Sequence, residues 1–166
     1  MSNKIRSFIA MFMSLIAASS SSAALPSGLF TGTISNNPLN ELCQLNQASI
    51  EFIETGNRGV TVNWIEQGLD RNTSYCENRF DLTLTPSSTA NSWDANFLWN
   101  YNLYFGKATL ANHVLTITAN YSASTTHLNF ETKLTINQNT TSLDYERRIE
   151  RWNGPTLIAT GALYQH

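Results

Sequence analysis

From residue 25 onward the sequence alternates apolar and polar side chains in many short runs and shows almost no helical period. Successive side chains of a strand point to opposite faces, so runs of this kind, rich in β-branched and aromatic residues, predict half-buried strands. Nine segments fit the pattern, at residues 28–34, 47–54, 58–66, 79–85, 96–105, 114–121, 127–137, 142–151 and 156–164.

The connections between these segments are mostly short. A parallel crossover needs about a dozen residues or more, so short turns favour antiparallel neighbours and an up-and-down order. An open sheet of eight or nine strands would leave two exposed edges, which closure into a barrel removes. We therefore predict an all-β, antiparallel up-and-down barrel of about eight or nine strands, with a β-sandwich as the alternative.

The first 24 residues have the three-part pattern of a secretory signal peptide. Lys4 and Arg6 precede an apolar run, which is followed by small residues ending at Ala24. The apolar run is shorter than the roughly 20 residues that span a bilayer. We expect export through a Sec-type pathway to the periplasm or medium, cleavage after Ala24, and a single domain over residues 25–166 that does not span the membrane.

The two cysteines, Cys43 and Cys76, are expected to form a disulfide, because exported proteins fold in an oxidising environment. In an antiparallel meander, the loops after the first and third strands lie at the same end. The predicted strand order places both cysteines there, in loops 35–46 and 67–78. We expect the disulfide to tie these loops into a rigid flap over one mouth of the barrel.

Charge and motifs exclude several functions. Without Lys4 and Arg6 the chain keeps 8 basic residues (10 − 2) against 12 acidic ones, so nucleic acid is not expected as a partner. The three histidines are not spaced for a metal site or a catalytic triad, and the glycines form no phosphate loop. We expect no cofactor, no metal and no enzymatic activity.

Three sequons begin at Asn72, Asn120 and Asn139, and they matter only where the host glycosylates exported proteins.

The most informative segment covers residues 96–105. Its odd positions carry Phe97, Trp99, Tyr101, Leu103 and Phe105, which we expect to face one way. Such a stripe most often belongs to the hydrophobic core. It can also line an internal cavity, in which aromatic rings offer contact area to a ligand. The candidate cavity wall consists of Trp64, Phe97, Trp99, Tyr101, Phe105, Phe130, Tyr145 and Arg147.

The segment 142–151 places arginines on the same side as Tyr145 and Ile149. A buried arginine must be paired or stacked. Arg147 could therefore bind Glu51, Glu54 or a ligand carboxylate; alternatively, this face reaches the rim and the arginines are solvated. The inward face of residues 58–66 also ends in a charge, at Glu66.

The opening Gly28-Leu29-Phe30-Thr31-Gly32 resembles the Gly-x-Trp opening of lipocalins and related calycin barrels, with phenylalanine in place of tryptophan. The resemblance implies an antiparallel barrel with an internal cavity for small apolar ligands. It also implies an arginine late in the chain that covers the opening aromatic residue. Arg147 and Arg151 are both candidates for that arginine, with Phe30 beneath it.

Three functions fit these observations. The leading hypothesis is an exported barrel that binds a small apolar or amphipathic ligand. The second is a protein-interaction module, such as an inhibitor or envelope accessory factor, that binds through loops 35–46, 67–78 and 86–94 with Trp93 as an anchor. The third is an outer-membrane barrel, which the charges on both faces of residues 142–151 argue against.

Overall fold

The computed structural model describes residues 24–36, 42–99, 101–121, 128–136, 141–151 and 154–166. The predicted signal peptide, residues 1–24, lies outside them except for Ala24. Ten strands form these regions: β1 (Gly28–Asn36), β2 (Cys43–Gly56), β3 (Gly59–Asp70), β4 (Tyr75–Pro86), β5 (Ser92–Trp99), β6 (Asn102–Ala111), β7 (Val114–Tyr121), β8 (Leu128–Ile136), β9 (Ser142–Arg151) and β10 (Leu157–Gln165).

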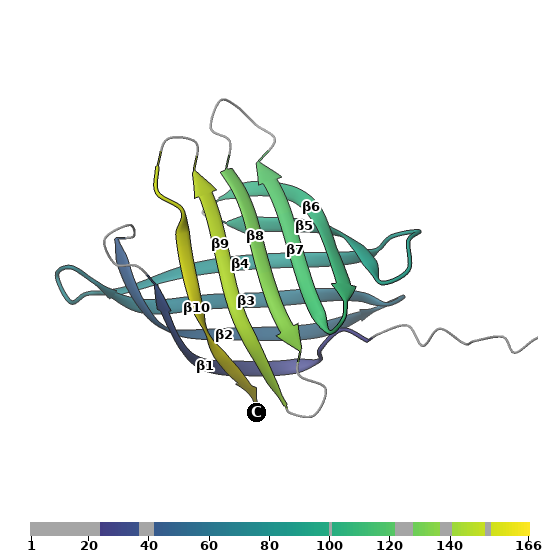
Figure 1. The fold of residues 1–166 in the computed structure, drawn as a ribbon, viewed down its shortest axis with the longest axis horizontal. Coiled ribbons are helices and arrows are strands. Elements are labelled where there is room, and N and C mark those ends of the chain that lie inside the picture. The colour runs from purple at the N-terminus through teal and green to yellow at the C-terminus, as the bar shows by residue number, and fades with distance from the viewer. Residues whose placement is uncertain (1–23, 37–41, 100, 122–127, 137–140, 152–153) are drawn as a thin grey trace, which may run out of the picture.

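Each strand pairs antiparallel with its neighbours in sequence, and β1 pairs with β10 to close the barrel. The predicted all-β, up-and-down barrel is confirmed, and the sandwich alternative is wrong. In Figure 1, β7 to β10 slant across the front of β2 to β4, so the barrel has two walls that cross each other. Closure leaves none of the ten described strands with an unpaired edge.

The predicted strand number was too low because residues 96–105 are a hairpin, not one strand. Trp99 pairs with Asn102, and Tyr101 adopts a φ of 64° in the turn between β5 and β6. The chain reverses there, so the alternation restarts in a different phase. Tyr104 faces the core at 2% exposure, whereas Tyr101 is fully exposed at 100% and Phe105 is 49% exposed. The expectation that the odd residues up to Phe105 share one face is therefore wrong.

Strands β1 to β4 are also longer than predicted, which shortens the loops at the disulfide. Cys43 is the first residue of β2 and Cys76 the second residue of β4, so neither lies in a long flap. The predicted pairing is present, with 6.0 Å between the two Cα atoms. Both cysteines lie at the end of the barrel where the odd-numbered strands finish, as the strand order predicts.

Gly68 of β3 lies between the two strands that the disulfide joins. It pairs with Leu45 of β2 on one side and with Cys76 of β4 on the other. A Cβ atom at this position would lie 2.0 Å from the backbone carbonyl oxygen of Gln44, a distance too short for any side chain. Glycine thus permits the close approach of β2 and β3 beside the disulfide.

We expect the variant with both Cys43→Ser and Cys76→Ser to unfold at lower urea concentration than the wild type. Disulfides typically contribute roughly 2–4 kcal/mol to the free energy of unfolding, and the chain-entropy model places a loop of this length near the upper end of that range. Adding a reductant should lower the stability of the wild type to the same level and leave the variant unchanged. Equal stability of wild type and variant would show that the disulfide contributes nothing.

Candidate ligand site at the disulfide-bearing mouth

A cavity of about 180 Å³ opens at the mouth that carries the disulfide. It is smaller than the roughly 300–1,000 Å³ typical of ligand pockets, so it can take a small molecule or one end of a longer one. The ends of β2, β4, β5, β9 and β10 form its wall. The lining residues are Leu42, Cys43, Asn78, Trp99, Arg147, Ile149, Arg151 and Leu157.

The cavity runs from an exposed rim to a buried floor. At the rim, Leu42 is 83% exposed and Arg151 is also exposed. Ile149 and Leu157 are buried at 1% and 3% exposure and provide apolar wall. Arg147 lies at the floor and is buried, at 0% exposure. Apolar contact area therefore separates the two arginines of this site.

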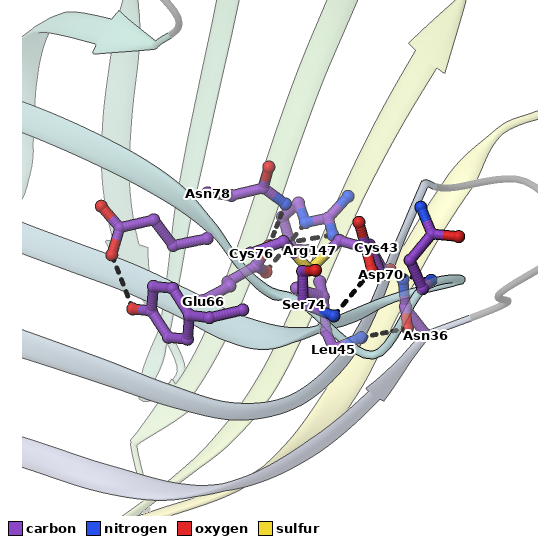
Figure 2. The surroundings of a disulfide bond; sticks show 12 residues. Asn36, Cys43, Leu45, Glu66, Asp70, Ser74, Cys76, Asn78 and Arg147 are labelled. Carbon is purple, nitrogen blue, oxygen red and sulfur yellow. Dashed lines mark hydrogen bonds and ion pairs between the residues drawn. A yellow bond between two sulfur atoms is a disulfide. The ribbon is translucent and has the colours of Figure 1, made fainter.

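The floor is held by an ion pair that crosses the barrel interior. Arg147 of β9 donates from Nε to Oε1 of Glu66 at 2.9 Å and from Nη2 to Oε2 at 3.0 Å. Glu66 lies on β3, in the opposite wall, and is also fully buried. Figure 2 shows Glu66 and Arg147 beside the disulfide, with Asn78 directed toward the same carboxylate.

Two further donors complete the environment of Glu66. The Tyr145 hydroxyl donates to Oε1, and the Asn78 amide donates from Nδ2 to Oε2 at 3.1 Å. An ionised carboxylate has about four lone-pair sites for hydrogen bonds. The four donors that surround Glu66 thus satisfy a charge that would be very costly to bury alone.

The Tyr145 hydroxyl stays protonated in this cluster. Burial is the largest cause that raises its pKa well above the usual value of 10, and the negative charge of Glu66 raises the pKa further, against a smaller lowering by Arg147. A protonated phenol can only donate to Glu66 or accept from a neighbour, so it is not poised as a base. The cluster therefore acts as a structural support for the cavity floor.

The expected partners of Arg147 were wrong. Glu54 is exposed, and Glu51 accepts a hydrogen bond from Asn63 at 3.2 Å on the outer side of the barrel. The alternative of a solvated Arg147 at the rim is also wrong, because its side chain is fully buried. The sequence signal for the true partner was the alternation along residues 58–66, which puts Glu66 on the same face as Trp64.

The aromatic residues fill the interior next to this cluster. Trp64 packs against Phe80 with ring centroids 4.4 Å apart and contacts Tyr145 edge-to-face at 5.7 Å. Phe80 also packs against Phe97 at 5.7 Å and Trp99 at 5.6 Å. These rings form a packed core that extends up to the cavity at Trp99.

The residues predicted to line a cavity therefore divide into four groups. Trp99 and Arg147 line the cavity at the mouth. Trp64, Phe97 and Tyr145 are buried in the packed interior. Tyr101 and Phe105 point outward, for the reason given above, and the side chain of Phe130 lies outside the described part of the structure. Sequence reasoning missed the lining residues Asn78, Ile149 and Leu157.

The predicted anchor of the protein-interaction hypothesis is not on the surface. Trp93 is 7% exposed, and its indole Nε1 donates to the carbonyl oxygen of Arg58 at 3.3 Å. Loop 86–94 also follows β4 and lies at the mouth opposite to the disulfide. The three loops expected to form one epitope therefore lie at two ends of the barrel.

That opposite mouth contains a second cavity, of about 350 Å³. Leu25 and Pro26 form part of its wall, together with Val60 and Trp93. Leu25 also packs on the hydrophobic core. The segment that begins the predicted mature chain thus lies at this mouth, and the charged residues that line the cavity, Glu54 and Arg58, are exposed.

The arginine that the lipocalin resemblance implies is not found over Phe30. Arg147 pairs across β10 with Ala159, which pairs with Asn36, so it lies level with the far end of β1. Arg151 lies at the disulfide-bearing mouth, whereas Phe30 lies near the opposite one and packs edge-to-face on Phe52 at 6.1 Å. Both assignments were wrong.

The described residues contain no helix long and apolar enough to cross a membrane. The same residues also contain no group of three or more metal-ligating side chains. Comparison of the sequence with protein-family models and with curated proteins found no match.

We expect Arg147→Met to lower the free energy of unfolding by about 3–5 kcal/mol, because it leaves Glu66 as a buried charge without its cation. Combining it with Glu66→Leu should restore much of that loss, since no buried charge then remains. The control is Arg148→Met, which removes an exposed pair with Glu150 at 3.1 Å and should cost at most about 1 kcal/mol. Urea unfolding of the four proteins measures this, and equal losses for the two single variants would contradict it.

We expect the stability of the wild type to fall more steeply above pH 10 than that of Tyr145→Phe. The raised pKa of Tyr145 means that folding favours the protonated phenol. Its contribution is complete below the pKa of the unfolded chain and is lost as pH rises toward the folded value. The control is Tyr164→Phe, because Tyr164 is 59% exposed. Parallel curves for wild type and Tyr145→Phe would be inconsistent with a buried, protonated Tyr145.

Proposed function

We propose that this chain is an exported β-barrel that binds a small amphipathic molecule in the cavity at its disulfide-bearing mouth. The observation that carries the proposal is the composition of the cavity. Apolar wall from Trp99, Ile149 and Leu157 surrounds the polar groups of Asn78 and Arg147. A mainly apolar hollow with a few fixed polar groups is typical of small-molecule sites.

The supporting structure makes the site rigid. Cys43 is itself a lining residue, and its disulfide to Cys76 joins β2 to β4 at the mouth. Arg147 and Asn78 are both fixed by hydrogen bonds to Glu66. A preformed site loses less conformational entropy when it binds, which favours affinity for a small ligand.

Trp99 adds a second reason to expect a ligand. Its indole Nε1 is buried and has no hydrogen-bond partner among the described residues. An unsatisfied buried donor costs roughly 1–3 kcal/mol, and such groups in native proteins call for an explanation. A ligand that accepts a hydrogen bond from Nε1 would offset this cost.

Export is supported by the signal-peptide pattern of residues 1–24 and by the disulfide, which persists in oxidising compartments. The Gly28-x-Phe30 opening and the closed barrel also support a likeness to calycins. In those barrels the ligand enters an internal cavity. Here the aromatic rings fill the interior, so we place the ligand at the mouth.

We expect octan-1-ol, added as an amphipathic probe, to shift the indole N–H resonance of Trp99 in a ¹H–¹⁵N spectrum. The chain has four tryptophans, so each indole signal can be followed separately. Trp99→Phe assigns the signal and should weaken binding. Trp93→Phe is the matched control, because Trp93 is buried to a similar extent at the opposite mouth. Shifts at Trp93 without shifts at Trp99, or no saturable shift at all, would refute a site at this mouth.

A further inference from the structure

The charges around the mouth cavity are unequal. Two of its lining residues are arginines, Arg147 and Arg151, and none is an aspartate or glutamate. The positive charge of Arg147 is balanced by Glu66, which lies beneath the floor and binds it at two positions. The cavity itself therefore retains the positive charge of Arg151.

Arg151 is not neutralised by the part of the protein that the structure describes. It forms no ion pair or hydrogen bond with any described residue, whereas Arg148 on the same strand is paired with Glu150 at 3.1 Å. Its side chain extends over Gly154, where an added Cβ would lie 3.3 Å from the Arg151 Cδ. The aliphatic part of the side chain thus lies against Gly154, and Arg151 is exposed at the rim.

The spacing along β9 sets the arrangement of the site. Arg147, Ile149 and Arg151 occupy successive positions of the same face, so apolar Ile149 lies between the balanced arginine and the unbalanced one. Leu157 and Trp99 extend the apolar wall beside Ile149. A molecule that fills the cavity meets apolar surface inside and a positive charge at the entrance.

We infer that the ligand is an anionic amphiphile, whose charged head pairs with Arg151 at the rim while its apolar part packs against Trp99, Ile149 and Leu157. This inference rests on the proposed function and adds the sign and the place of the ligand's charge. The planar guanidinium suits a carboxylate, which it can bind through two parallel hydrogen bonds. A cationic amphiphile of the same length would place like charges together at the entrance.

The test compares three probes with the same eight-carbon chain: octanoate, octan-1-ol and octyltrimethylammonium. Dissociation constants come from titrations of the Trp99 indole signal at low salt. An ion pair at an exposed rim is modest, so we expect octanoate to bind up to about fivefold more tightly than octanol, and the cation to bind more weakly. The preference for octanoate should decrease as salt is added, because exposed charges are screened.

Variants of β9 identify the charge responsible. Arg151→Gln should reduce octanoate binding to the octanol level and leave octanol binding unchanged, and Arg151→Lys should retain part of the preference. Arg148→Gln is the matched control, since Arg148 lies on the same strand but faces outward. An equal loss in both glutamine variants would show a general effect of surface charge and would overturn the inference.

The outcomes separate the two proposals. Equal binding of octanoate and octanol by the wild type would overturn the anionic ligand and leave the amphipathic site in place. Tighter binding of octyltrimethylammonium than of octanoate would also overturn the anionic ligand and leave the amphipathic site in place. No saturable binding of any of the three probes at Trp99 would overturn both the inference and the proposed function.

Discussion

The ion pair between Glu66 and Arg147 is the interaction on which the interior of this barrel depends. It joins β3 to β9, two strands in opposite walls, and it is satisfied by two further donors, Tyr145 and Asn78. Buried charges tolerate little misplacement, because losing one partner leaves the other unpaired in a medium of low polarity. The pair therefore favours the one arrangement of the two walls in which both charges keep their partners.

The candidate site is a consequence of that arrangement. On one side of the ion pair the aromatic rings around Trp64 and Phe80 fill the interior. On the other side, toward the disulfide, Arg147 forms the floor of a small cavity. The pair thus divides a packed core from an open mouth. The disulfide then joins β2 to β4 at the mouth, so that the ion pair and the disulfide both support residues that line the cavity.

Much of the fold follows from local patterns. The bounds of β7 and β9 agree with the predicted segments, and the inward faces of β3 and β9 were recognised by alternation. The hairpin of β5 and β6 was not, because Asn100-Tyr101-Asn102 continues the alternation without glycine or proline. Asparagine tolerates the left-handed conformations of a tight turn, and that signal was available. Because this turn was missed, Phe105 was predicted to face inward, and Tyr104 was not recognised as a core residue.

Outside the β5–β6 hairpin, the amino-acid pattern was enough to locate the strands, the faces of β3 and β9 that turn inward and the end of the barrel at which the cysteines meet, because these depend on a period of two and on chain order. Only the tertiary structure decided that Glu66 binds Arg147 and that Trp99, Ile149 and Arg151 share one cavity. Contacts across the interior depend on how the closed sheet is tilted and staggered. That geometry is set by all ten strands together, and no single segment carries it.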